Sequence, residues 1–211
     1  MIKIKKFTAT NLEFKEIARI RNLVNHDSID HPDEDKNDWT IRDKSLIRDR
    51  LLLYHGNILI GLLYYVQGRD ENSRTCFFNI VLDPQYHNNG YREILYQEML
   101  KKIKKFNGNK LFGHVYDHAN YRNHQKLLIK HNFKLVQTNR EYSCDIREVN
   151  IEKYKPLIKK LESEGIKFYD SRDQMLDWPN HYEKLEELDW VLDQDIPHPD
   201  GIKPTRMPFK Q

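Results

Sequence analysis

The sequence predicts an α/β fold in which helices cover both faces of a central sheet. Residues 75–82 form a nearly continuous apolar run, which is typical of a strand buried on both faces. Two more apolar segments flank the His-Gly-Asn turn at residues 55–57 and predict a hairpin. Strand patterns and amphipathic helix patterns follow one another over residues 1–146, which indicates layers of helices on a sheet.

The first predicted elements are a short strand over residues 2–4, where apolar and charged residues alternate, and a helix that Thr10 or Asn11 can cap. Residues 26–38 contain six acidic residues and one proline, so we expect an exposed loop there. A helix is expected over residues 39–46. The acidic charge would attract a cationic amine, and the same composition is typical of an ordinary solvated loop.

The middle of the chain combines strands with one long helix. Apolar residues over 51–54 and 58–66 form the two strands of the predicted hairpin. The buried strand over 75–82 ends at an Asp-Pro pair. Beyond Gly90, apolar residues recur at helical spacing and predict a helix that stops at the Asn-Gly-Asn sequence of residues 107–109.

The next segment continues the alternation of strands and helices. A strand is predicted over residues 111–116 and a helix over residues 121–131. Residues 133–136 and 140–146 have strand composition and predict a hairpin that closes the sheet. The first domain is therefore expected to span residues 1–146.

The C-terminal part of the chain differs in composition. Charged amphipathic helices are predicted over residues 151–164 and 180–192, with a short strand over 166–169 between them. Four of the eight prolines lie between residues 197 and 208, which predicts an extended or loose end. Residues 147–211 therefore form a mainly helical appendage. Its apolar faces need the first domain, a second copy in a homodimer or a partner chain to cover them.

The charge of the chain favours some partners over others. The 211 residues include 35 Lys and Arg and 32 Asp and Glu, for a net charge of +3. The positive excess lies in residues 1–146, which hold 24 basic and 18 acidic residues. This mild excess suits an anionic small molecule. We expect no nucleic-acid partner, because the basic run over residues 101–105 falls on the solvated face of a predicted helix.

Other features of composition indicate the compartment. No segment approaches 18 consecutive apolar residues, and the N-terminus lacks the apolar stretch of a signal peptide, so we expect a cytoplasmic protein without membrane contact. Cys76 and Cys144 predict two reduced thiols rather than a disulfide framework. Two cysteines cannot form a four-ligand zinc site of their own, so we expect no metal.

The segment that is most informative about function is residues 81–95, where a buried strand runs into a short polar loop that opens directly onto a helix. Such a junction directs several unpaired backbone N–H groups and the positive end of the helix dipole at one place. A pyrophosphate would be held there by backbone donors, with little need for lysine. An ordinary strand–loop–helix connection has the same local pattern, and Gly90 alone does not distinguish the two.

This segment resembles the acetyl-CoA signature of the GNAT acyltransferases, a Val- and Pro-containing strand end followed by a Gly-containing loop and a leucine-bearing helix. The chain has Val81, Pro84, His87, Gly90 and Arg92 at the signature positions. The loop is therefore similar to a loop that binds the pyrophosphate of acetyl-CoA.

The resemblance extends along the chain. Residues 2–22 look like the opening strand and helix of the family, residues 54–61 like its hairpin, and residues 114–133 like its Val, Asn and Gly-Phe stretch. It implies a GNAT-like mixed, mostly antiparallel sheet with helices on both faces over residues 1–146. Residues 147–211 look like the linker and the incomplete opening part of the second domain in tandem-GNAT proteins.

The resemblance implies an acetyl-CoA-dependent N-acetyltransferase, in which a primary amine of a small molecule or a peptide attacks the acetyl thioester directly. Main-chain donors of the central strand would bind the pantetheine arm and polarise the thioester carbonyl. The residues that it assigns to acetyl-CoA are Ile80, Val81, Leu82, His87, Asn88, Asn89, Gly90, Tyr91, Arg92 and Asn120. The amine must also lose a proton, and from the polar residues near the strand ends we select Tyr116 and His118 as catalytic residues.

Four positions depart from the family pattern. His87 replaces an Arg or Gln, and Asn132 replaces the glycine before the family's Phe. Arg92 replaces a small residue beside the pyrophosphate, so its side chain would either obstruct the phosphates or pair with one. Leu128 stands where many members have a tyrosine that protonates the leaving thiolate. These departures leave a second hypothesis, a catalytically degenerate GNAT-like binding or regulatory module.

Overall fold

The chain forms two compact units, Met1–Lys134 and Leu135–Gln211. The computed structural model describes residues 1–25, 29–68, 74–106, 108–140, 142, 144–168, 178–197 and 206. The predicted loose end at residues 197–208 lies almost entirely outside the described residues.

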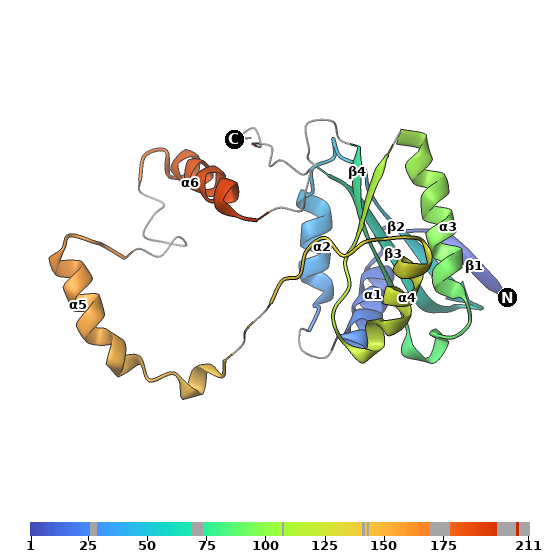
Figure 1. Ribbon diagram of the computed structural model, residues 1–211, viewed down its shortest axis with the longest axis horizontal. Coiled ribbons are helices and arrows are strands. Elements are labelled where there is room, and N and C mark those ends of the chain that lie inside the picture. Colours follow the sequence, from blue (N-terminus) through green and yellow to red (C-terminus); the bar gives the residue numbers. More distant parts are fainter. Residues whose placement is uncertain are drawn as a thin grey trace. The chain divides into compact units, whose positions relative to one another are not determined.

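The first unit is built on a five-stranded sheet whose strands lie in sequence order (Figure 1). The strands are β1 (Ile2–Lys6), β2 (Arg48–His55), β3 (Ile58–Gln67), β4 (Thr75–Leu82) and β5 (Lys110–Gly113). Strands β1 to β4 pair antiparallel, whereas β4 and β5 pair parallel. The sheet is therefore mixed and mostly antiparallel, as the resemblance implied.

Helices cover both faces of this sheet, which confirms the predicted fold class. The helices of the first unit are α1 (Asn11–Val24), α2 (Pro32–Ile41), α3 (Tyr91–Ile103) and α4 (Arg122–Lys130), with short 3-10 turns η1 (Pro84–Tyr86), η2 (Lys104–Phe106) and η3 (Ala119–Tyr121). Helices α3 and α4 pack on the face that presents Leu63 and Ile80, and α1 packs on the face that presents Leu62 and Val81. Strand β4 thus buries side chains on both faces, as its continuous apolar run predicts.

Helix α1 begins at a reciprocal cap. The Thr10 hydroxyl accepts a hydrogen bond from the Glu13 amide at 3.2 Å, and the Glu13 carboxylate accepts one from the Thr10 amide at 3.1 Å. This capping box satisfies two backbone donors at the start of the helix. Of the two predicted caps, Thr10 is the one that the structure uses, and Asn11 is the first helical residue.

Helix α2 occupies part of the segment that composition indicates to be a loop. The prediction of an exposed loop over residues 26–38 is wrong for residues 32–38, which are helical, and residues 26–28 lie outside the described residues. Pro32 suits the first helical turn, and acidic residues there interact favourably with the helix dipole. The same composition therefore starts a helix, which ends at Ile41 rather than near residue 46.

One acidic residue of α2 is buried. Asp35 accepts hydrogen bonds from both Nη atoms of Arg50 on β2, at 2.6 Å each, and only 1% of the Arg50 surface is exposed. Burial by itself raises the pKa of Asp35, but the Arg50 hydrogen bonds and the charge of Arg21 outweigh it and hold this pKa below its ordinary value. The Arg50 guanidinium also lies over the Phe7 and Trp39 rings. A non-local ion pair therefore attaches α2 to the sheet.

The far edge of the sheet is shorter than predicted. Strand β5 ends at Gly113, and the described residues of the expected hairpin over 133–136 and 140–146 contain no strand. Because β5 has only four residues, it offers few backbone groups for further strands to pair with. The first compact unit accordingly ends at Lys134, before the boundary that the predicted hairpin would give.

The second unit is helical in its described residues. Its elements are η4 (Ile146–Glu148), η5 (Ile151–Tyr154), α5 (Lys155–Ser163) and α6 (His181–Asp195), and the two α-helices match the predicted ones. Residues 166–168 are not a strand, because the described part of this unit contains no other strand to pair with, and Tyr169 lies outside it. Neither α5 nor α6 fully buries a residue. Over the described ranges of the whole chain, every helix is too short or too polar to cross a membrane.

We expect Asp35→Ala to lower the free energy of unfolding by about 3–5 kcal/mol, because it leaves the buried Arg50 guanidinium without a counter-charge. The ion pair should stabilise the fold above about pH 4, the pKa of an unfolded Asp, and lose its effect as the pH falls through the lowered pKa of Asp35. Urea denaturation measures both effects. The control is Asp33→Ala on an exposed position of the same helix, and equal costs for the two variants would contradict the assignment.

We expect Gly61→Ala to lower the free energy of unfolding by about 1–3 kcal/mol through overpacking. Gly61 pairs with Leu82 across β3 and β4, and an added Cβ would lie 2.3 Å from Leu82 Cδ2. The same substitution in a Leu82→Val background should cost less, since the shorter side chain makes room. Equal costs in both backgrounds, again by urea denaturation, would show that the Leu82 contact is not the cause.

Candidate functional site

Strands β4 and β5 separate before β4 ends. Their last paired residues are Phe78 and Gly113, and the last hydrogen bond between the two segments joins the His114 amide to the Phe78 carbonyl at 3.3 Å. Strand β4 continues to Leu82, whereas β5 stops at Gly113. Residues 79–82 therefore lack a strand neighbour on the β5 side among the described residues.

The backbone groups of this part of β4 alternate between its two sides. The Asp83 amide donates to the Ile60 carbonyl of β3 at 2.9 Å, which sets the phase of the alternation. This alternation directs the backbone N–H and C=O groups of Val81 toward β3. The same groups of Ile80 and Leu82 point toward the open side. Of the three strand residues predicted to bind acetyl-CoA, two therefore present their backbone to the opening.

The open side of β4 holds unsatisfied backbone groups. The Leu82 carbonyl accepts a hydrogen bond from His87 Nε2 at 3.0 Å. In the part of the chain that the structure describes, the Ile80 amide and carbonyl and the Leu82 amide have no hydrogen-bond partner. An extended ligand that contains amide groups can pair with such an edge.

Leu128 of α4 lies at the point where the strands separate. A Cβ added to Gly113 would come within 2.8 Å of Leu128 Cδ2, so the glycine allows α4 to pack directly on the end of β5. Leu128 is buried and carries no ionisable group. This position, where the resemblance leads one to expect a tyrosine, therefore cannot supply a proton.

The loop after β4 ends in a helix start with free donors. Gly90 adopts the left-handed conformation, with φ of 71°, and directly precedes α3. Within the described residues, no hydrogen bond satisfies the amides of Asn88, Gly90, Tyr91 or Arg92. Residues 88–90 are exposed, and a Cβ added to Gly90 would meet no atom within 4 Å. These free amides and the positive end of the α3 dipole point to solvent at one place, which is an arrangement that can bind an anion.

Asn123 of α4 connects this loop to the helix beside it. Its Nδ2 donates to Asn88 Oδ1 at 3.3 Å and to the His87 carbonyl at 3.5 Å. Together with the bond from the His87 ring to the Leu82 carbonyl, these contacts hold the loop between β4 and α4. The predicted loop residues are thus brought together at one end of the sheet.

The Arg92 side chain is turned into the protein and away from the exposed loop. It is 5% exposed, and its Nε and Nη1 atoms are buried without a hydrogen-bond partner. Burial lowers the pKa of Arg92 to about 10, so the guanidinium is charged at neutral pH. Burial and then the Arg92 charge also lower the pKa of His87, so the two side chains are within electrostatic range of each other.

His124 lies beside Arg92 and is fully buried. Both of its ring nitrogens lack a hydrogen-bond partner among the described residues. Burial first, and then the charges of Arg92 and His114, lower the pKa of His124 to about 3, so the ring is neutral at pH 7. Burial raises the pKa of the neighbouring Tyr121 to about 12, so its hydroxyl keeps its proton. The Arg92 cluster, which consists of Arg92, Tyr121 and His124, therefore holds one positive charge and no negative charge.

The two predicted catalytic residues have different surroundings. Tyr116 is 37% exposed, and its ring centroid lies 5.1 Å from that of the buried Tyr121. His118 is exposed, and its Nδ1 accepts a hydrogen bond from the Asn120 amide at 3.3 Å, which caps η3. Tyr116 therefore lies next to the Arg92 cluster, and the described contacts of His118 are local.

Asn120, predicted to contact acetyl-CoA, makes a structural hydrogen bond. Its Nδ2 donates to the Val24 carbonyl at the end of α1, at 2.9 Å. The bond satisfies one of the carbonyls that a helix end leaves unpaired. Its side-chain oxygen has no partner among the described residues, so it remains available to a ligand.

Sequence reasoning did not select Tyr121, Asn123 or His124. Tyr121, His124, Leu127 and Leu128 recur at helical spacing and face the core. A histidine and a tyrosine on an otherwise apolar helix face are a signal of a buried polar cluster. Their neighbour Arg92 is distant in sequence, however, and no local pattern pairs it with them.

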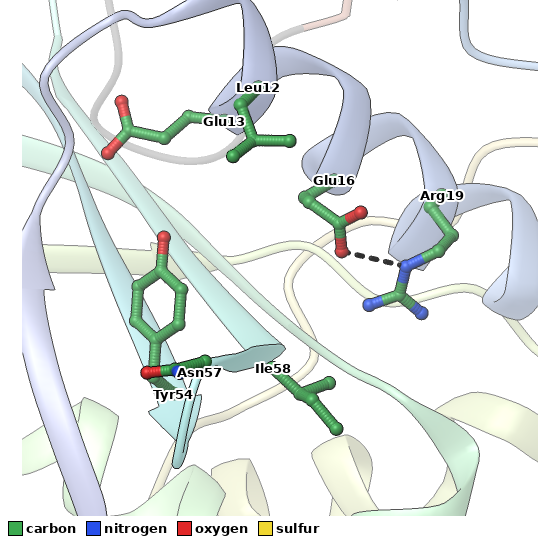
Figure 2. Close-up of a pocket in the computed structure, with 7 residues that line it drawn as sticks. All are labelled: Leu12, Glu13, Glu16, Arg19, Tyr54, Asn57 and Ile58. Atoms are coloured by element: carbon green, nitrogen blue, oxygen red, sulfur yellow. Dashed lines mark hydrogen bonds and ion pairs between the residues drawn. The ribbon is translucent and has the colours of Figure 1, made fainter.

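A separate pocket of about 390 Å³ lies between α1 and the β2–β3 hairpin (Figure 2). It is lined by Leu12, Glu13, Glu16, Arg19, Tyr54, Asn57 and Ile58, none of which is a predicted site residue. Its charged groups are already engaged: Glu16 pairs with Arg19 at 2.9 Å, and Glu13 belongs to the α1 cap. We therefore place the candidate site at the open edge of β4.

Solved structures with this architecture define its fold class. One similar structure is that of a protein assigned to the GNAT family of acetyltransferases, from Desulfovibrio desulfuricans. It has a TM-score of 0.53 and 12% sequence identity, and the match covers 64% of this chain and 85% of that protein. An aminoglycoside acetyltransferase from a soil metagenomic sample, solved with sisomicin, has a TM-score of 0.53 and 10% identity over 68% of this chain and 97% of its own. The chain therefore has the GNAT fold.

A third similar structure is an aminoglycoside N-acetyltransferase in complex with CoA, with a TM-score of 0.50 and 14% identity over 68% of this chain and 95% of its own. Neither the protein-family models nor the curated proteins give a match. At these identities the likeness concerns the fold. The tandem-GNAT interpretation of residues 147–211 stays a prediction.

We expect acidification from pH 7 to pH 5 to lower the free energy of unfolding by about 2 kcal/mol through His124. Unfolded His124 takes up a proton near pH 6.5, whereas the folded residue does so only near pH 3, so acid favours unfolding. His124→Phe keeps an aromatic ring but cannot take up a proton, so it should remove this part of the pH dependence, as measured by urea denaturation at both pH values. His118→Phe, at an exposed site, is the control, and unchanged pH dependence in His124→Phe would contradict the assignment.

Proposed function

We propose that this protein is a CoA-thioester-dependent N-acetyltransferase that transfers an acetyl group to a primary amine of a small molecule or a peptide. The observation that carries the proposal is that, within a GNAT fold, the open edge of β4 leads to free amides at the start of α3. The first feature suits an extended arm with amide groups, and the second suits a diphosphate. Acetyl-CoA has both.

The residues present fit acetyl-CoA as the acyl donor. Gly90 has open space around it, which leaves room for a diphosphate at the amides of Gly90 and Tyr91. Ile80 and Leu82 offer strand backbone groups to the amides of the pantetheine arm. The buried Arg92 side chain does not cover the exposed loop.

In the proposed reaction the amine nitrogen forms a bond to the thioester carbonyl carbon, and the carbon–sulfur bond breaks. The chain contributes mainly by holding the two reactants in line, with open-edge amides placed to stabilise the developing oxyanion. Leu128 cannot protonate the sulfur, so CoA leaves as a thiolate. A thiol pKa of about 8.5 makes this leaving group accessible near neutral pH. The amine proton passes to water, and Tyr116 is the candidate side chain for holding that water by a hydrogen bond.

The second candidate function is a catalytically inactive module that binds a CoA thioester. The observation that favours it is the absence of a proton donor at Leu128, together with the local role of His118. Both candidates predict binding of acetyl-CoA, and only the first predicts amide formation.

We expect isothermal titration calorimetry to detect acetyl-CoA binding, and Asn89→Glu to raise its Kd by about tenfold or more. The substitution adds a carboxylate beside the free amides, where it repels the diphosphate and competes for the donors. The matched control is Asn109→Glu, which adds the same charge beyond the other end of α3 and should leave the Kd unchanged. No binding by the wild type at millimolar acetyl-CoA would overturn the proposal.

Turnover separates the two candidates. Release of free CoA thiol is measured with a panel of primary amines, and product formation by mass spectrometry. Cys144 is a free, exposed thiol that a thiol reagent would also detect, so a Cys144→Ser variant serves for the thiol assay. Binding without any amide product across the panel would support the inactive module and exclude the transferase.

A further inference from the structure

We propose that Arg92 is a phosphate-binding residue of this chain, which pairs with a phosphate of the CoA thioester and so makes binding depend on the nucleotide half of the donor. The inference rests on the proposed function and adds a side-chain ligand to the backbone donors of the loop. It starts from an arginine residue that is 5% exposed and whose Nε and Nη1 atoms have no hydrogen-bond partner among the described residues.

The electrostatics around Arg92 are unbalanced in the free protein. A buried charge is normally paired, because leaving water without a partner is costly. Here the groups within electrostatic range of the guanidinium are the neutral rings of His124 and Tyr121 and the side chain of His87. Arg92 also lies in the first turn of α3, where the helix dipole disfavours a positive charge. An anion bound to the guanidinium would pair the buried charge and offset its unfavourable interaction with the helix dipole.

The nearby carboxylates of the chain are committed elsewhere. Glu93 accepts hydrogen bonds from Lys130, His131 and Gln97, and the Lys130 and Gln97 bonds hold its pKa at about 2. Asp83 caps η1 through the Gln85 amide and pairs with Arg19. Among the described residues, no acidic side chain is hydrogen-bonded to Arg92, so its guanidinium is available to an anionic ligand.

The position of Arg92 is suited to a phosphate. Its own amide and those of Tyr91 and Gly90 are free, so a phosphate at the start of α3 would be within reach of the flexible arginine side chain. A guanidinium presents a planar fork of donors that binds phosphate oxygens in pairs. Its movement toward the phosphate would vacate space beside His87, next to the open edge of β4, where the proposed function places the pantetheine arm.

Calorimetry on Arg92→Met tests the inference, with CoA, pantetheine and inorganic pyrophosphate as the three probes. We expect the Kd for CoA to rise by tenfold or more, and the affinity for pantetheine, which lacks phosphates, to stay unchanged. Loss of pyrophosphate binding as well would place the contact on the diphosphate, whereas retained pyrophosphate binding would place it on the other phosphate of CoA. Arg92→Lys should restore part of the affinity, and Lys101→Ala, which removes one exposed charge from the same helix, should change nothing.

A second readout is thermal unfolding without ligand. Arg92→Met removes an unpaired buried charge and keeps an apolar chain of similar length, so its Tm should equal or exceed that of the wild type. Unchanged or tighter CoA binding in Arg92→Met would overturn the inference and show that the side chain only fills or obstructs the site, while leaving the proposed function intact. Failure of the wild-type protein to bind CoA would overturn both.

Discussion

The separation of β4 and β5 is the constraint on which the candidate site depends. Four strands pair along their length, but β5 ends at Gly113, where Leu128 of α4 packs against the glycine. The last residues of β4 are consequently held by β3 on one side only, and their other backbone groups stay unsatisfied. A sheet that ended evenly would have no such edge, and the loop and α3 would follow an ordinary closed strand.

Two buried arginines show how the same residue type serves different purposes in this fold. Arg50 is matched by the bidentate carboxylate of Asp35 and surrounded by aromatic rings, so its charge is balanced within the protein and attaches α2 to the sheet. Arg92 has comparable burial and no such match. In the first arrangement both Nη atoms of Arg50 are paired within the protein, and only its Nε lacks a partner among the described residues. In the second, no acidic side chain of the described residues balances the charge, which is the basis for proposing an anionic ligand.

Local pattern was enough to predict the elements whose signals are local, among them the Thr10 cap, the hairpin around Gly56 and the continuous apolar run of β4. The loop before α3 was found in the same way, through its glycine and its position. Predictions failed where distant residues decide the structure. The acidic segment of α2 is helical in part because Asp35 is paired with Arg50. The described residues of 133–146 form no strand, and β5, with four residues, offers few backbone groups for one to pair with. The cluster of Arg92 and His124 joins two helices: His124 on an apolar helix face is a local signal of a buried polar group, but no local pattern pairs it with Arg92.

The close approach of Gly61 to Leu82 links the hairpin to the site. Leu82 ends the open edge of β4 and carries the carbonyl that holds His87, while its side chain fills the space that a larger residue at position 61 would need. Homologous sequences should therefore not vary independently at these two positions. A larger residue at position 61 is compatible only with a smaller residue at position 82. Correlated substitutions at these two positions would therefore show that the contact between the hairpin and the end of β4 is maintained in evolution.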